Sequence, residues 1–256
     1  FQAPFSILSA LAWKYIDTNK ERENIRKALG YYLPKKLADQ LARNVADLRT
    51  SGQMVYGTCL FTDIERYTTL SESMEPTELH IFMNKYFEAL FEPVTQHGGI
   101  VAEIQGDCML AIWGASNPDT ALRKQACLAA LGISSAVHRF NQTSDAIQLP
   151  TRIGLHSGRM FLGHVGAIDH YEYRPTGDIV NTASRIEGLN KHLNTEKLVS
   201  RDVLEQLDGF LTRELGIFLF LGKSRPVIVY ELICQMGDAT EQQKMLCTTF
   251  AEGLFA

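Results

Sequence analysis

Three features are missing from the sequence: an excess of basic residues, cysteine pairs at metal-binding spacing, and a phosphate-binding P-loop. The chain has 25 Lys and Arg against 29 Asp and Glu, a net charge of −4. A basic stripe, typical of nucleic-acid-binding proteins, is therefore not expected, and we expect no nucleic-acid partner. The five cysteines are odd in number and form no CxxC pair, which excludes a disulfide framework and a zinc site. Without a GxxxxGK(S/T) segment, a Walker-type nucleotide site is excluded too.

Long hydrophobic runs are also scarce. Residues 1–13 are mostly apolar but too short to span a bilayer. Because the chain starts at a phenylalanine, we interpret it as part of a longer protein and this segment as the end of a transmembrane helix. The basic residues on its cytoplasmic side would be Lys14, Lys20 and Arg22. An ordinary apolar start of a soluble helix is the alternative.

The segment that follows is charged, with apolar residues at helical spacing and breaks at Gly30 and Pro34. We therefore expect residues 1–50 to hold the end of a membrane segment and a helical signalling linker from an upstream membrane sensor in the same chain. The remainder would be the cytoplasmic domain of a protein of the inner or plasma membrane.

Hydrophobic periodicity divides the rest of the chain into a compact domain, 51–234, and a helical tail, 235–256. We expect helices over residues 75–97, 119–141 and 178–193. Strands are expected over residues 54–64, 100–105, the adjoining CMLAIWG, two stretches within 149–165 around His156-Ser157-Gly158, 211–221 and 227–233. The order β-α-β-β-α-β with additional strands and helices predicts an α+β fold with a ferredoxin-like core.

Two aspartates stand where such a fold could bind metal. Asp63 follows an apolar strand, and Asp107 lies in the tight turn of a predicted hairpin. A carboxylate at the end of a buried strand is costly unless a cation offsets its desolvation. Two of them on neighbouring strands could hold a pair of Mg²⁺ ions and the phosphates bound to them. Either aspartate taken alone could simply cap a turn.

Four stretches together resemble the class III nucleotidyl cyclases, the adenylate and guanylate cyclases. They are FTDIERYTTLSE, GGIVAEIQGDCMLAIWG, RIGLHSGRMFLGHVG and YEYRPTGDIVNTASRIEGLNK, spanning about residues 57–233. The resemblance implies a homodimer with two head-to-tail sites, each built from both subunits and each using two Mg²⁺ or Mn²⁺ ions. It implies that Asp63, Asp107 and the backbone carbonyl of Ile64 bind the metals.

The same resemblance assigns the other half of each site to the second subunit. Asn181 would position the ribose and Arg185 would stabilise charge on the α-phosphate, four residues apart on one helix face. Lys223 falls in the loop where the family has a triphosphate-binding lysine. By composition alone, Asn181 and Arg185 would be an ordinary solvated face.

The base pocket departs from both family patterns, because the specificity positions hold Glu103 and Arg174. Glu103 can accept from guanine N1–H and N2–H₂ while Arg174 donates to O6, or the pair can read adenine N6 and N1. The two charges could also simply pair with each other. The form of the last stretch resembles cyclases that follow an extracellular CHASE2 sensor, which favours ATP, with GTP as the alternative.

A second departure is Arg66, where the family usually has glycine beside the phosphates. Arg66 could add a cation there or obstruct the loop. The expected activity is conversion of ATP to 3′,5′-cyclic AMP and pyrophosphate. The rival of another class is a silent cyclase-like module that only dimerises.

Overall fold

The computed structural model of the protein describes residues 13–14, 20, 23, 52–143, 147–167 and 170–254. Nearly all of the predicted linker, 1–50, lies outside these residues, so its helices stay a prediction. Among the helices that are described, none combines the length and the hydrophobicity needed to cross a bilayer. The chain divides into two compact units, one formed by Gln53–Leu162 and Arg174–Ala256, the other containing Gly163–Tyr173.

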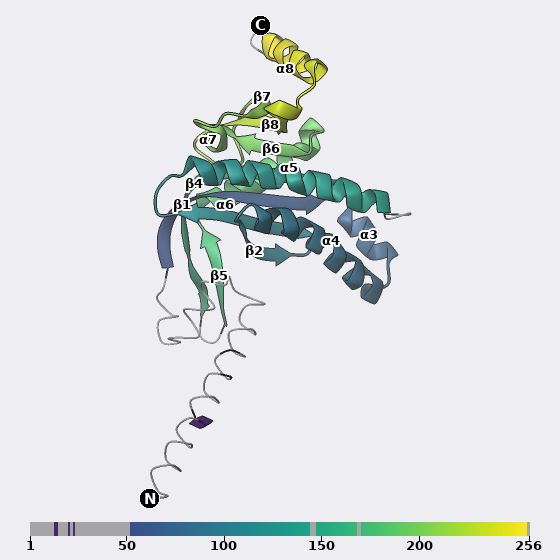
Figure 1. Cartoon of the computed structure of the whole chain (residues 1–256), viewed down its shortest axis with the longest axis vertical. Helices are drawn as coiled ribbons and strands as arrows, with labels where there is room; N and C mark the ends of the chain where they lie inside the picture. The colour runs from purple at the N-terminus through teal and green to yellow at the C-terminus, as the bar shows by residue number, and fades with distance from the viewer. Residues whose placement is uncertain are drawn as a thin grey trace, which may run out of the picture. The chain divides into compact units, whose positions relative to one another are not determined.

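A single eight-stranded sheet organises the described part of the chain (Figure 1). Its strands are β1 (Gly52–Ile64), β2 (Ile100–Gln105), β3 (Cys108–Ala115), β4 (Thr151–Ala167), β5 (His170–Thr176), β6 (Lys197–Ser200), β7 (Phe210–Phe218) and β8 (Val227–Gln235). The order is β2-β3-β1-β4-β6-β8-β7, and β5 pairs with β4. β1 and β3 are antiparallel, while β4 and β6 are parallel. The predicted α+β class is confirmed.

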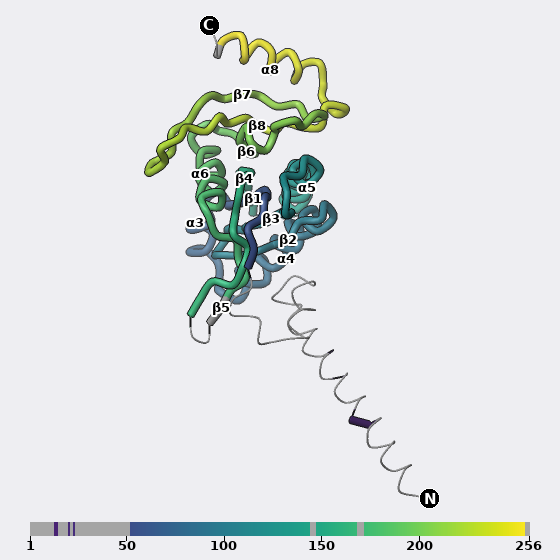
Figure 2. The backbone as a smooth tube through the Cα atoms, turned by 90° about the vertical axis from the view of Figure 1, so that its left-hand side faces the viewer, coloured from purple at the N-terminus to yellow at the C-terminus, as the bar shows by residue number. Residues whose placement is uncertain are grey.

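Helices α4 (Pro76–Gln96) and α5 (Thr120–Thr143) cover one face of the sheet (Figure 2). Tyr86 and Leu90 of α4 pack with Trp113 of β3 in the larger core. Tyr86 is fully buried, and its hydroxyl forms a hydrogen bond of 2.8 Å with Thr151 Oγ1. Burial of these large side chains is the main force that fixes the helices on the sheet.

Helix α6 (Asp178–Leu193) lies on the opposite face, over a smaller core (Figure 2). Ile179 and Ala183 of α6 pack there with Met160 of β4. The close approach depends on Gly154, because a Cβ at this position would lie 2.2 Å from the backbone nitrogen of Glu187. The helix therefore sits at a fixed depth on β4.

One predicted element is wrong. The two strands expected within residues 149–165 are a single strand, β4, that runs without interruption through His156, Ser157 and Gly158. The polar residues do not break it, because the Ser157 hydroxyl pairs at 2.7 Å with Thr58 Oγ1 of β1 and His156 Nδ1 lies 2.8 Å from Ser200 Oγ of β6. The sequence analysis also missed β5, β6 and the short helices α3 (Tyr67–Ser73) and α7 (Arg201–Leu204).

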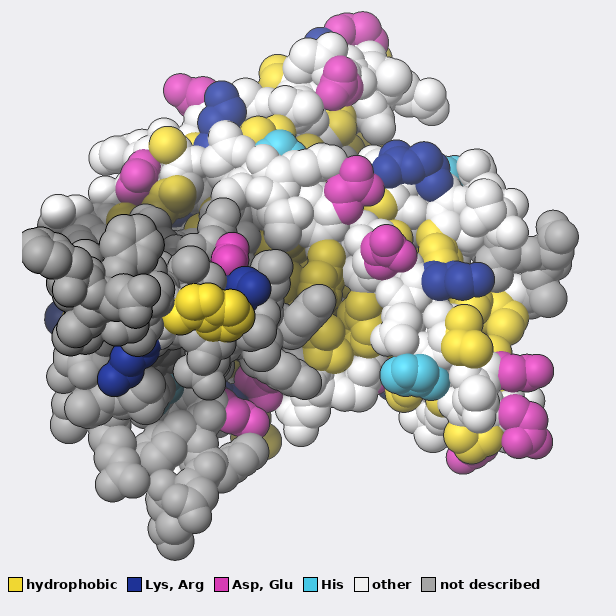
Figure 3. Space-filling model, turned by 60° about the horizontal axis from the view of Figure 1, so that its bottom comes forward, with side chains coloured by type: hydrophobic (Ala, Val, Ile, Leu, Met, Phe, Trp, Pro, Cys, Tyr) yellow, Lys and Arg dark blue, Asp and Glu magenta, His cyan; other side chains and the backbone are white. Residues whose placement is uncertain are grey.

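After β8, a 3₁₀ turn (Met236–Asp238) leads into helix α8 (Glu241–Leu254), within the tail for which the sequence predicts a helix. The helix packs against β7, where the Arg213 guanidinium lies 4.7 Å from the ring centroid of Phe250. Acidic and basic side chains are interspersed on the face drawn in Figure 3.

Candidate active site

Asp63 and Asp107 come together at one end of the paired central strands. Asp63 is the last residue but one of β1, and Asp107 follows Gly106, which has a φ of 62°, in the turn between β2 and β3. Carboxylate oxygens of both aspartates and the Cys108 sulfur lie within 4.8 Å of one another. The Ile64 N–H donates to Asp107 Oδ2 at 3.1 Å, and the Cys108 thiol donates to Asp63 Oδ1 at 3.2 Å.

The electrostatics of this pair favour a hard cation. Burial, and then the charge of Asp63, raise the pKa of the Asp107 carboxyl, although the Ile64 N–H partly offsets the rise. Burial raises the pKa of the Cys108 thiol to about 12, and the neutral thiol is a hydrogen-bond donor to Asp63. Two carboxylates without a thiolate suit Mg²⁺ or Mn²⁺ and not a soft metal. The residues present therefore fit the expected metal ions.

Cationic side chains surround the same carboxylates. A cavity of ≈ 550 Å³ is lined by Asp63, Asp107 and Glu65 and by Arg66, Arg152 and Lys191. The Arg152 guanidinium, only 14% exposed, lies 3.2 Å from Glu65 and 4.0 Å from Asp63. A cavity with both metal-binding carboxylates and cations can hold a polyphosphate.

Arg152 is a site residue that the sequence analysis did not identify. A basic residue next to the start of a mostly apolar strand, in the RIGLHSG stretch, was the available signal. Lys191 was also missed, because a lysine on a helix usually marks a solvated face.

Asn181 and Arg185 lie on the exposed face of α6, one turn apart, as their spacing predicts. Arg185 Nη1 donates to the backbone carbonyl of Leu221, in the turn between β7 and β8. Of the described residues, those lining the cavity at Asp63 do not include Asn181 or Arg185. The two sets of predicted site residues thus occupy different places on one chain.

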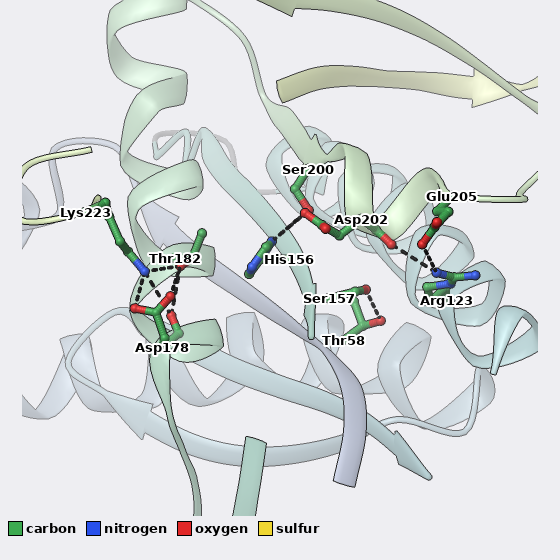
Figure 4. A network of polar contacts seen from close by, with 10 residues as sticks. All are labelled: Thr58, Arg123, His156, Ser157, Asp178, Thr182, Ser200, Asp202, Glu205 and Lys223. Carbon is green, nitrogen blue, oxygen red and sulfur yellow. Dashed lines mark hydrogen bonds and ion pairs between the residues drawn. The ribbon is translucent and has the colours of Figure 1, made fainter. Parts of the chain in front are cut away.

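Lys223 is held by the first turn of α6 (Figure 4). Its ammonium group pairs with the Asp178 carboxylate and donates to Thr182 Oγ1. The hydrogen bond from Lys223 lowers the pKa of Asp178. Lys223 therefore lies beside the helix that carries Arg185, where it is engaged by a carboxylate.

Glu103 of β2 and Arg174 of β5 form an ion pair of 3.0 Å, and their side chains are 26% and 34% exposed. The pairing that the sequence analysis left open is therefore present. An ion pair that is partly open to solvent still offers a carboxylate oxygen and guanidinium N–H groups to a ligand edge.

Glu187 of α6 is a further group that the sequence did not reveal. It is 9% exposed, and its Oε1 atom is buried without a hydrogen-bond partner among the described residues. Burial, and then the charge of Asp63, raise its pKa to about 8, against the opposing effect of Arg152. The neutral acid is therefore favoured near the carboxylate pair at neutral pH.

Known proteins match most of the chain. The protein-family model of the adenylate and guanylate cyclase catalytic domain matches residues 52–233 of the sequence. Adenylate cyclase 1 of Rhizobium meliloti (strain 1021) is 34% identical over 209 residues, which are 79% of this chain and 31% of that protein. An adenylate cyclase of Anabaena cylindrica is 32% identical over 186 residues, 68% of this chain and 36% of that protein. The chain thus spans about a third of the length of these curated relatives.

Solved structures share the fold. A bacterial light-regulated adenylyl cyclase superposes with a TM-score of 0.71 at 23% identity, over 96% of this chain and 68% of that chain. The guanylyl cyclase Cya2 superposes with a TM-score of 0.64 at 24% identity, over 75% of this chain and 98% of that chain. At this identity the likeness concerns the fold alone. From the family match, the identity to its relatives and the motif residues together, we conclude that this chain belongs to the adenylate and guanylate cyclase catalytic domain family.

Proposed function

We propose that the chain is an adenylate cyclase domain that converts ATP to 3′,5′-cyclic AMP and pyrophosphate at sites shared by two copies of the chain. The observation that carries this proposal is the Asp63–Asp107 carboxylate pair in a cavity lined by cations. The family match supports the reaction class, and the two relatives named adenylate cyclase support the choice of ATP.

The metal half of the site is formed by Asp63, Asp107 and the backbone carbonyl of Ile64. Two Mg²⁺ or Mn²⁺ ions bound there would neutralise phosphate charge and lower the pKa of the ribose 3′-hydroxyl. Arg152 and Lys191, which line the same cavity, are placed to bind the triphosphate.

The second half comes from the other copy of the chain. In this proposal Asn181 orients the ribose, and Arg185 stabilises the charge that develops on the α-phosphate. Both side chains are exposed on α6, away from the cavity of their own chain, which supports a shared site. Lys223 leaves its ion pair with Asp178 and binds the triphosphate of the same substrate.

The reaction does not require a protein side chain as general base. The 3′-oxygen attacks the α-phosphorus in line, the bond from phosphorus to the bridging oxygen breaks, and pyrophosphate leaves. The proton of the 3′-hydroxyl passes to water or to a substrate phosphate oxygen.

The purine is read by Glu103 and Arg174, with Glu103 accepting from the N6 amine and Arg174 donating to N1. One specific observation favours a second candidate, GTP: a carboxylate at position 103 can accept from both N1–H and N2–H₂ of guanine.

An assay of the purified protein with ATP and with GTP, each with Mg²⁺ and with Mn²⁺, tests the proposal. We expect cyclic AMP and pyrophosphate in equal amounts, and a higher kcat/KM for ATP than for GTP. A higher value for GTP would make the protein a guanylate cyclase. If a preparation that binds nucleotide and dimerises forms neither cyclic product, the protein is a catalytically silent cyclase-like module.

A further inference from the structure

Arg66 adopts a backbone conformation that arginine rarely occupies. Its φ of 64° and ψ of 28° place it in the left-handed region, just before α3. For a residue with a Cβ this conformation costs about 1 kcal/mol or more, whereas glycine occupies it freely. An unfavourable residue kept in such a place can indicate that its side chain serves another purpose.

The surrounding hydrogen bonds fix this conformation. The Ile64 N–H donates to the Asp107 carboxylate at 3.1 Å, and the Glu65 N–H donates to the Pro150 carbonyl at 2.8 Å. The Arg66 carbonyl accepts from the Leu70 N–H at 3.2 Å. The loop is therefore held on both sides of Arg66, and the direction in which its side chain leaves the backbone is set by the same bonds that hold Asp107.

Arg66 is one of the residues that line the cavity containing Asp63 and Asp107, and it also borders a second cavity beside Ile147 and Pro150. It is 83% exposed, and its Nε atom lies 3.8 Å from Glu65, a contact that contributes little in water. The Glu65 carboxylate is already engaged by the mostly buried Arg152, 14% exposed, at 3.2 Å. The Arg66 guanidinium is consequently available to an anion that enters the cavity.

The charges of the side chains around the cavity show why an available guanidinium matters there. Three acids, Asp63, Glu65 and Asp107, are matched by three cations, Arg66, Arg152 and Lys191. Before metal binds, the net formal charge of these side chains becomes negative without Arg66, which opposes the approach of a polyanion. A cationic side chain also forms charge-assisted hydrogen bonds with phosphate oxygens.

We propose that Arg66 is a substrate-binding residue that contacts the polyphosphate of the nucleotide held at the carboxylate pair of its own chain. The inference rests on the proposed function for the identity of the nucleotide. Arg66 contacts the polyphosphate of the nucleotide and not its base or ribose. The same contact would hold the pyrophosphate product.

The test compares Arg66→Gly with Arg66→Lys. The probe is inorganic tripolyphosphate with Mg²⁺, and its Kd for the dimeric protein is measured by calorimetry. We expect Arg66→Gly to weaken tripolyphosphate binding roughly tenfold, because a charge-assisted hydrogen bond is lost. Arg66→Lys should recover most of the affinity. With nucleotide as substrate, KM and the inhibition constant of pyrophosphate should rise by the same factor in Arg66→Gly, while kcat changes by less than about twofold.

Thermal stability gives an independent readout. Because glycine relieves the left-handed conformation, Arg66→Gly should fold with an equal or higher Tm while it binds polyphosphate less well. Gln206→Gly is the matched control, because Gln206 has a φ of 56° and is exposed in the loop after α7. It should raise the Tm without changing tripolyphosphate affinity. Arg139→Gln removes an exposed arginine from α5 and should change neither.

Three results would overturn the inference: tripolyphosphate affinity unchanged in Arg66→Gly, Arg66→Lys as weak as Arg66→Gly, or an unchanged KM for the nucleotide in Arg66→Gly. If the parent protein makes no cyclic nucleotide, the proposed function fails, yet tripolyphosphate binding still decides the role of Arg66. If the parent cyclises ATP and Arg66→Gly keeps its KM, only the role of Arg66 is lost.

Discussion

The two halves of the proposed site differ in how complete they are within one chain. In the carboxylate half, Asp63 and Asp107 lie close together, and each accepts a hydrogen bond from a neighbouring residue. In the cation half, Arg185 and Lys223 are held by groups of their own chain, the Leu221 carbonyl and the Asp178 carboxylate.

This difference indicates which half is preorganised to bind a ligand. Burial, and then the charge of Asp63, raise the pKa of Asp107, so two partly buried carboxylates facing each other carry an electrostatic cost. A cation would relieve it, so this half is preorganised. The cations of α6 and the β7–β8 turn have partners already and, in the proposed function, would exchange them for phosphate. We therefore expect the carboxylate half to determine whether the protein is active at all, and the cation half to depend on assembly.

The largest expected effect comes from breaking the carboxylate half. Asp107→Ala should lower kcat by about 1,000-fold or more, because charge neutralisation at the phosphates is lost. The dimer should persist, and the Tm of the metal-free protein should stay equal or rise, since a desolvated carboxyl is removed. Asp208→Asn, at an exposed carboxylate before β7, is the control and should keep full activity. Normal turnover by Asp107→Ala would show that the pair does not bind catalytic metal.

The second prediction asks whether the halves really belong to different chains. Asp63→Ala and Arg185→Ala should each be inactive alone. When mixed in equal amounts, half of the dimers should contain one intact site, so activity should return to about a quarter of the parent value. The measurement is cyclic nucleotide formation after subunit exchange has been verified with two affinity tags. Exchange without any recovery would place all site residues in one chain.

The third prediction concerns the Glu103–Arg174 pair, which lies in neither half of the comparison. Glu103→Lys with Arg174→Thr exchanges the donor and acceptor positions, because a lysine can donate to adenine N1 and a threonine hydroxyl can accept from the N6 amine. If ATP is the substrate, kcat/KM for ATP should be kept within a few fold, while a guanylate cyclase should lose about tenfold or more with GTP. Competition between the two nucleotides in one assay gives the ratio directly.

The smallest effect is expected at Glu187, beneath the carboxylate half. Its pKa rises from 4.5 to about 8 on folding. Below the lower value the group is protonated in both states. Between the two values only the folded state keeps the proton, so the stability of the protein falls as pH rises and then levels off above about 8. Glu187→Gln should remove this loss and raise the free energy of unfolding by about 1–2 kcal/mol at pH 8, with little change at pH 4.5.

Chemical denaturation in EDTA across this pH range measures the effect without metal. Parallel stability curves for Glu187→Gln and the parent would contradict the raised pKa.

Much of the fold followed from local pattern. The helix expected over residues 178–193 has these bounds in the structure, because apolar residues repeat at helical spacing after Gly177. The error at β4 has a tertiary cause. His156 and Ser157 look like a loop in the sequence, and only partners on neighbouring strands, Ser200 and Thr58, make them acceptable within a strand.

The sequence by itself determined the family, the α+β class and the identity of the residues that resemble its motifs, because these depend on residue type and spacing along the chain. Only the tertiary structure decided that Asp107 accepts from Ile64, 43 residues away, and that Arg152 joins the same cavity. It alone decided the left-handed backbone of Arg66 and the raised pKa of Glu187. Electrostatic cost and hydrogen-bond restraint depend on distances through space and on burial, and a linear pattern contains neither.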